Sequence, residues 1–198
     1  MDWWSDGRLE AKGFQINVSG GVSGMLRTLG QAATGHSGWY IETDCTPLPA
    51  DDLTKYNEVV NTPLGLWYDP GKISNIAGKL INFVKTGNNG ELNWPGVFQL
   101  NDTFYVDDKK DYVVDSSKVI LLLEFSKSCK GLSLYNMANH NCTDITMEAM
   151  KKAGVTPPDC RHTVTFVYRE RDNNGVVQTF QQDVEMSLPE LLFKEIMK

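Results

Sequence analysis

The chain has 198 residues, of which 41% are hydrophobic and 22% charged, as is ordinary for a globular protein with one sizeable core. Its formal net charge of -6 excludes the broad basic surface with which proteins bind nucleic acids. Every apolar run is far shorter than the roughly 18 residues that suggest a membrane span, so we expect no integral membrane segment.

The first two thirds of the chain predict short strands separated by loops. Residues 14–18 alternate apolar and polar side chains, which is typical of a half-buried strand, and the apolar run at 119–125 reads as a fully buried one. A proline-containing loop or short helix is expected over residues 44–63, and Asn88-Asn89-Gly90 predicts a turn. The strands that we expect are at residues 14–18, 36–42, 64–68, 112–114 and 119–125.

Residues 142–153 predict a helix. Ile145, Ala149 and Ala153 recur at intervals of four and give it one apolar face. Asn141 is suited to cap its N-terminus, and Gly154 to end it. Cys142 would then lie at or next to the first helical residue.

The C-terminal part predicts a hairpin and a helix. Residues 163–169 and 176–184 flank Asp172-Asn173-Asn174-Gly175, a hairpin turn signal. Ser187 and Glu190 have the spacing of a capping box that opens a last amphipathic helix. We expect a single domain over residues 1–198, with a core at about 14–160 and the hairpin and helix at about 163–198.

Cys142 is the candidate nucleophile. A thiol attacks only as the thiolate, and a helix N-terminus lowers the pKa of a cysteine. The free N–H groups of the first helical turn could also hold an oxyanion during acyl transfer. The structural alternatives are a buried, inert Cys142 or a disulfide between Cys129 and Cys142.

Nucleophilic catalysis also needs a base that reaches the sulfur across the fold, and the chain has three histidines. His36 opens an expected strand after Gly35, where a substrate backbone can come close. His140, two residues before Cys142, is better suited to a cap or to the wall of a cleft, and His162 begins the hairpin. The residues by themselves favour His36 and leave the other two open.

Two sequence boxes resemble those of circularly permuted papain-like proteins. Residues 34–41 (TGHSGWYI) resemble the box with the histidine, and residues 135–144 (YNMANHNCTD) resemble the box with the cysteine, which continues as AGVTP at 153–157. Residues 64–70 (LGLWYDP) resemble a stretch found between the boxes in a bacterial branch. Histidine before cysteine is the permuted order, as in YiiX-like and lecithin-retinol-acyltransferase-like members of the NlpC superfamily. The resemblance covers roughly residues 14–160.

This resemblance implies an α+β fold in which an antiparallel sheet packs against the helix with the cysteine. It also implies that Cys142 forms a thioester while His36 takes and returns the proton. A third polar residue usually orients the histidine; Asp69 is our first candidate, with Gln99 and Asn101 as alternatives. The residues expected to bind the substrate are Gly35, Trp39, Trp67, Tyr68, His140 and Asn141.

The function expected from these boxes is that of a cysteine amidase or peptidase that cuts the peptides of peptidoglycan, such as an antibacterial effector with an immunity protein as partner. The alternatives are a lipid acyltransferase, phospholipase or thioesterase on the same scaffold, and a non-catalytic binding domain. We expect no metal and no organic cofactor. Residues 1–6 do not form a secretory signal, so we expect synthesis in the bacterial cytoplasm and, for an effector, export by a dedicated machine to a target periplasm.

Overall fold

The structure is a computed structural model that describes residues 14–18, 37–41, 54–60, 62, 64–69, 71–100, 112, 114–196 and 198. At positions 14–18, 99, 100, 116 and 190 it describes the backbone alone.

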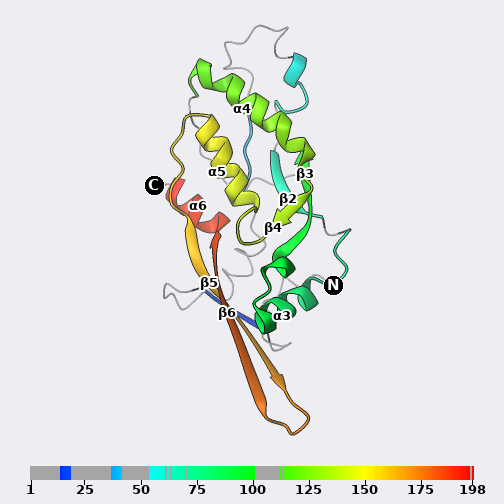
Figure 1. The fold of residues 1–198 in the computed structure, drawn as a ribbon. Helices are drawn as coiled ribbons and strands as arrows, with labels where there is room; N and C mark the ends of the chain where they lie inside the picture. The colour runs from blue at the N-terminus through cyan, green and yellow to red at the C-terminus, as the bar shows by residue number, and fades with distance from the viewer. Residues whose placement is uncertain are drawn as a thin grey trace.

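Two antiparallel sheets of three strands each form the framework of the described residues (Figure 1). One has the order β2-β3-β4, with β2 at Leu64–Tyr68, β3 at Asn93–Leu100 and β4 at Leu134–Asn136. The other has the order β1-β5-β6, with β1 at Phe14–Val18, β5 at Arg161–Arg171 and β6 at Val177–Ser187. The strands predicted at residues 14–18 and 64–68 are confirmed, and so is the mixed α+β class.

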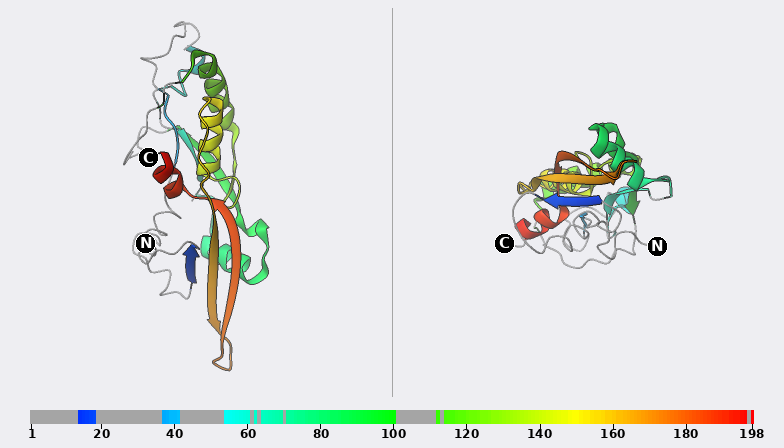
Figure 2. Two further views of the ribbon diagram at one scale, coloured as in Figure 1. Left: turned by 90° about the vertical axis from the view of Figure 1, so that its left-hand side faces the viewer. Right: turned by 90° about the horizontal axis from the view of Figure 1, so that it is seen from below.

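Four α-helices and three short 3-10 helices complete the described part of the chain. α5 packs against α4 and against β2, whereas α3 packs against β5 and β6 (Figures 1 and 2). None of the described helices is both long enough and apolar enough to cross a membrane. The α-helices are α3 (Ile76–Thr86), α4 (Ser116–Ser128), α5 (Cys142–Lys152) and α6 (Pro189–Ile196). The 3-10 helices are η2 (Thr54–Tyr56), η3 (Asn89–Leu92) and η4 (Cys129–Gly131).

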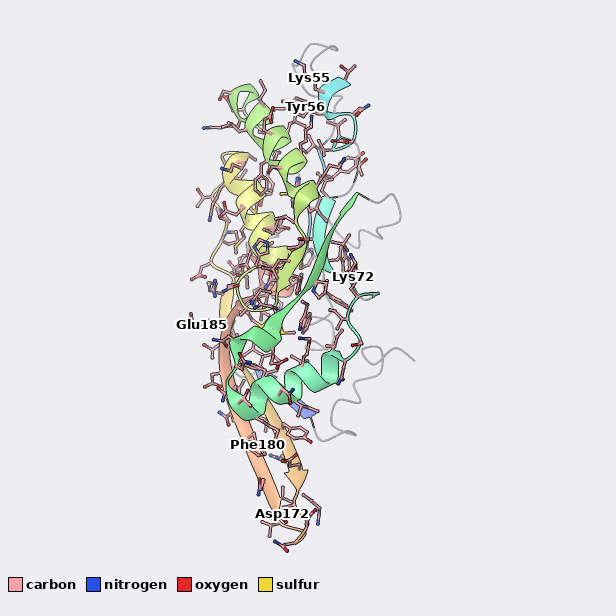
Figure 3. All side chains as sticks on the ribbon, turned by 45° about the vertical axis from the view of Figure 1, so that its right-hand side comes forward. Lys55, Tyr56, Lys72, Asp172, Phe180 and Glu185 are labelled. Atoms are coloured by element: carbon pink, nitrogen blue, oxygen red, sulfur yellow. The ribbon has the colours of Figure 1, made fainter. Side chains whose placement is uncertain are left out.

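The predicted C-terminal hairpin is confirmed and is longer than expected. β5 and β6 pair along their whole length, from Arg161 opposite Ser187 to Arg171 opposite Val177. In the turn, Gly175 has a φ of 80°, a left-handed conformation that favours glycine. The hairpin extends well away from the other elements, with Asp172 at its far end (Figure 3). Its root belongs to a sheet with the first strand, because β1 pairs with residues 164–168 of β5.

The strand expected at residues 36–42 is shorter than predicted. Within the described residues 37–41, Trp39 alone forms a bridge, exchanging two backbone hydrogen bonds with Leu64 at 3.0 and 2.9 Å. Gly38 has no side chain to pack on a sheet and weakens a strand at this point.

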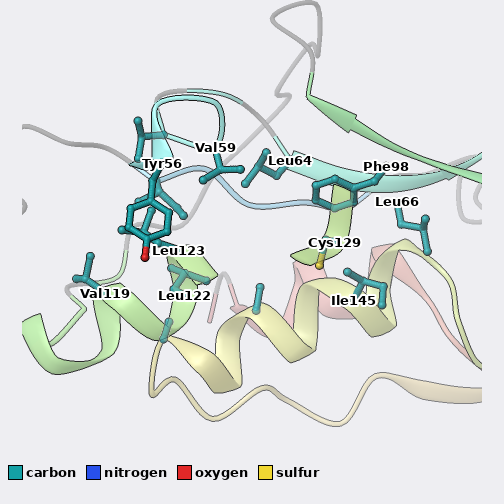
Figure 4. Packing of buried hydrophobic residues seen from close by; sticks show 14 residues of the cluster. Tyr56, Val59, Leu64, Leu66, Phe98, Val119, Leu122, Leu123, Cys129 and Ile145 are labelled. Carbon is teal, nitrogen blue, oxygen red and sulfur yellow. The ribbon is translucent and has the colours of Figure 1, made fainter. Parts of the chain in front are cut away.

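Two hydrophobic clusters fill the described part of the molecule. The first lies between α4, α5 and the β2-β3 pair (Figure 4). The second lies between α3 and the root of the hairpin. Side chains of the first cluster include Leu64, Leu66, Phe98, Leu122, Leu123, Ile145 and Ala149. Side chains of the second include Leu80, Phe83, Trp94, Val164, Phe166 and Val184.

The strand predicted at residues 119–125 is wrong, because this run lies inside α4. Tyr112 and Val114, part of another expected strand, lie outside any strand. An apolar run of this length does not separate a buried strand from a buried helix by its periodicity. The burial pattern is helical: Val119, Leu122, Leu123 and Ser126 are buried, at intervals of three and four. Asp115 caps the helix by accepting a hydrogen bond from the N–H of Ser117 at 2.8 Å.

Two leucines of α4 test this helix directly. Leu123 is 0% exposed and Leu121 is 48% exposed, although both would face the same side of a strand. Leu123→Ala should lower the free energy of unfolding by roughly 2–5 kcal/mol through the cavity that it leaves. Leu121→Ala should change it by less than about 0.5 kcal/mol, as is usual for a surface position. Urea unfolding of both variants measures this, and equal losses would contradict the helix.

Candidate functional site

Cys142 is the first residue of α5, as predicted, and Asn141 is its N-cap. The side-chain oxygen of Asn141 accepts hydrogen bonds from the N–H groups of Thr143 at 2.9 Å and Asp144 at 3.2 Å. In return, Asp144 Oδ2 accepts the N–H of Asn141 at 3.1 Å, which completes a capping box. Gly154, with a φ of 79°, follows the helix at its other end, as expected of a stop signal.

This cap changes the expectation for an oxyanion site. Two first-turn amides, those of Thr143 and Asp144, are already bound to the Asn141 side chain. An oxyanion donor would therefore come from Cys142 itself or from outside the helix. The Asn141 amide nitrogen is also engaged, because it donates to the carbonyl groups of Met137 and Ser187, each at 3.0 Å. Its observed role is that of a cap, and a role toward a substrate stays a prediction.

The thiol of Cys142 is in no disulfide and is almost fully enclosed, with 4% of the residue exposed. Burial raises its pKa above the usual value of 9.0, whereas hydrogen bonds from the backbone and side chain of Ser37 and from Thr143 act in the opposite direction. Cys129 and Cys160 are also free and buried, so the alternative disulfide between Cys129 and Cys142 is absent. The helix position alone therefore does not produce a thiolate at neutral pH.

A second contact brings the two sequence boxes together. The hydroxyl group of Ser37 donates a hydrogen bond to the hydroxyl oxygen of Thr143 at 3.2 Å, across 106 residues of chain. The same serine is among the groups that lower the pKa of the Cys142 thiol. His36 and Gly35, which precede Ser37, lie outside the described residues.

Tyr135 is a residue of this site that the sequence analysis left out of its candidates. Its ring stacks on Trp94 with centroids 5.9 Å apart and meets Tyr68 edge-on at 6.1 Å. Burial raises the pKa of its hydroxyl well above the usual 10.0, and the charges of Cys142, Tyr68 and Asp144 add to the effect. Tyr135 therefore lies close enough to Cys142 to sense its charge. Tyr135 is the first residue of the cysteine box, and this position in the sequence could have identified it as a candidate.

The other predicted substrate-binding residues fall in two groups. Tyr68 and His140 lie near the cysteine box: Tyr68 contacts Tyr135, and the backbone of His140 is bonded in both directions to Asn136 at 3.0 Å, just before the helix. Trp39 instead packs into the first hydrophobic cluster.

The indole nitrogen of Trp39 donates to Ser126 Oγ at 2.9 Å, and its ring lies 5.6 Å from that of Phe98. These contacts make Trp39 a part of the core that holds the histidine-box segment against α4. Trp67 is half-buried on β2. The structure does not test whether either tryptophan contacts a substrate.

Asp69, the first candidate for a third catalytic residue, lies in the turn after β2. It accepts a hydrogen bond from the N–H of Gly71 at 3.1 Å and forms an ion pair with Lys72 at 2.9 Å. The ammonium group of Lys72 is the main reason why the pKa of Asp69 is below its usual value. The contacts described for Asp69 are thus those of a turn. The structure does not describe Asn101 or the side chain of Gln99, the two alternative candidates.

Among the described residues, no three His, Cys, Asp or Glu side chains gather as a set of metal ligands. What this part of the chain offers is a buried thiol at a capped helix N-terminus. Comparison with known protein families, curated proteins and solved structures finds no match to the chain, so its activity is argued from its own residues.

Proposed function

We propose that this chain is a cysteine hydrolase of the circularly permuted papain-like kind, with Cys142 as the nucleophile and His36 as the general base. In this proposal the bond that it cuts is an amide in the peptides of peptidoglycan. The corresponding biological role is that of an antibacterial effector that an immunity protein neutralises.

The observation that carries the proposal is the contact between the two boxes. Ser37, the covalent neighbour of His36, donates a hydrogen bond to Thr143, the residue after Cys142, and also lowers the pKa of the Cys142 thiol. A contact at Ser37 supports a histidine base within reach of the sulfur. No local feature of the sequence requires this contact, since the partners are more than 100 residues apart.

The arrangement of elements also supports the proposal. The helix with Cys142 packs on β2, which pairs antiparallel with β3. The histidine box precedes the cysteine box in the chain, as the permuted order requires.

The raised pKa of the Cys142 thiol gives the base a defined task. A protonated thiol is a poor nucleophile, so His36 takes the Sγ proton as the sulfur attacks the amide carbonyl. The C–N bond breaks, the leaving amine receives that proton, and a thioester remains. His36 then takes a proton from water, whose oxygen attacks the thioester; the carboxylic product leaves and Cys142 recovers its proton.

The test is an assay of hydrolysis with soluble muropeptides and, separately, with vesicles of phosphatidylethanolamine and phosphatidylglycerol. We expect the wild-type protein to add one water for each peptide bond cleaved in the muropeptides, as mass spectrometry detects. His36→Ala should lower this rate by roughly 10²–10⁴-fold, which is the usual contribution of a general base. His162→Ala is the matched control, because it removes another histidine of the chain.

Each outcome separates the alternatives. If His162→Ala abolishes muropeptide hydrolysis and His36→Ala does not, His36 is not the general base and that assignment is overturned. Deacylated lipid in place of cleaved peptide would move the assignment to the lipid enzymes. If the wild-type protein forms no product from either substrate, the proposed hydrolase function is overturned, and a non-catalytic binding domain is the alternative that remains.

A further inference from the structure

The end of the C-terminal hairpin touches the first turn of the helix that carries Cys142. Ser187, the last residue of β6, is 0% exposed. Its hydroxyl group donates to Asp144 Oδ1 at 2.6 Å, and its carbonyl oxygen accepts from the Asn141 amide at 3.0 Å. One residue therefore holds both members of the capping box from outside the helix.

The serine is itself held in place. The N–H of Leu188, the next residue, donates to the carbonyl oxygen of Cys160 at 3.2 Å. β6 pairs with β5 up to Ser187, which lies opposite Arg161. Because the root of the hairpin is fixed on both sides, it can act as a rigid support for the helix N-terminus.

We propose that Ser187 is a positioning residue for Cys142, which acts by clamping the capping box of Asn141 and Asp144 around the nucleophile. Its effect on catalysis rests on the proposed hydrolase function, whereas its effect on the thiol does not. Cys142 lies between the two clamped residues in the first turn, so a shift of this turn moves the sulfur. Reaction rates fall by about 10²-fold when a reacting group is displaced by roughly 1 Å.

The bond to Asp144 also has an electrostatic consequence. A hydroxyl group that donates to a carboxylate stabilises its negative charge locally. The titratable side chains that share this region are Asp144 on α5, Tyr135 on β4, Tyr68 on β2, Asp159 and Cys160 before β5, and Arg161 at the start of β5. Asp144 lies two residues after Cys142 in the same helical turn. Without the Ser187 hydroxyl its charge is less compensated, and we expect the thiolate of Cys142 to be harder to form.

The same hairpin offers a matched control. Thr165 Oγ1 donates to Asp183 Oδ1 at 2.7 Å, a bond of the same chemical kind between β5 and β6. This pair is exposed and does not belong to the capping box. Thr165→Ala thus removes a hydroxyl-to-carboxylate bond from the hairpin while it leaves the clamp intact.

The experiment compares wild type, Ser187→Ala, Ser187→Thr and Thr165→Ala, each as the full chain. The ionisation of Cys142 is followed by NMR of protein with ¹³C-labelled cysteine, and muropeptide hydrolysis is followed by mass spectrometry. For Ser187→Ala we expect the thiol titration to move to higher pH and kcat to fall by roughly 10–100-fold with KM unchanged. Ser187→Thr keeps the hydroxyl group and should restore both toward wild type.

A purely structural role would lower the stability of Ser187→Ala to urea and leave the thiol titration of the folded protein unchanged, which would overturn the proposal. An equal shift with Thr165→Ala would overturn it as well. The wild-type protein could cleave no muropeptide while the thiol titration still moves in Ser187→Ala alone. That result would overturn the proposed hydrolase function and support the positioning role of Ser187.

Discussion

Replacing Cys142 by alanine should lower the rate of muropeptide hydrolysis by at least ~10⁴-fold, because the thioester cannot form without the thiol. The fold should survive, since alanine is smaller and the site is at the start of a helix that tolerates it. The measurement is the rate of product formation by mass spectrometry at equal concentrations of folded protein. Circular dichroism verifies that the variant retains its helices.

Cys129→Ala is the control for this substitution. Cys129 is also free and buried, but it lies in η4 within the first hydrophobic cluster. Burial raises its pKa to about 11, so it stays a protonated thiol at neutral pH. We expect this variant to hydrolyse muropeptides at the wild-type rate. Equal activity of Cys142→Ala and wild type would remove Cys142 as the nucleophile.

Asn141→Ala should lower the free energy of unfolding by roughly 3–6 kcal/mol, which is more than the loss of a cap alone. The cap itself contributes about 1 kcal/mol. The remainder comes from two carbonyl groups, of Met137 and Ser187, that would lose their donor in the interior. Urea unfolding, followed by circular dichroism, measures the difference from wild type.

Asn75→Ala separates these two contributions. Asn75 is the N-cap of α3 and accepts a hydrogen bond from the N–H of Gly78 at 2.8 Å, but it is exposed. Its replacement should therefore lose only about 1 kcal/mol. Similar losses for the two asparagines would show that the side-chain nitrogen of Asn141 adds nothing beyond an ordinary cap.

The helix at Cys142 was predictable because its signals are local. Asn141 and Asp144 are three residues apart and cap the helix with each other, and Gly154 ends it. The hairpin turn at residues 172–175 is local in the same sense. Such signals work within one turn of the chain, where covalent connection already brings the partners together.

Two helices were missed, each for its own reason. The run at residues 119–123 is apolar throughout, so its sequence favours burial without choosing between strand and helix. The choice came from packing, which leaves Ile120 and Leu121 exposed on one side of α4. α3 has a cap at Asn75 and a left-handed glycine at Gly87, signals that the sequence analysis did not use.

The predicted capping box at the last helix illustrates what tertiary contacts can change. Ser187 and Glu190 have the required spacing, and α6 begins close to the expected place. The hydroxyl group of Ser187, however, bonds to Asp144, 43 residues away. A buried hydroxyl group forms its hydrogen bond with the partner that the fold places beside it, and sequence spacing cannot name that partner.

The sequence by itself thus determined the helix with Cys142, its cap and the hairpin, because each depends on neighbours in the chain. Only the tertiary structure decided what surrounds the thiol: Ser37 on one side, Tyr135 nearby, and Ser187 behind the capping box. The hydrogen bonds of Ser37 and Ser187 join residues 106 and 43 positions apart. They exist because the two hydrophobic clusters bring the sheets and α5 together, and the burial that results raises the pKa of the Cys142 thiol.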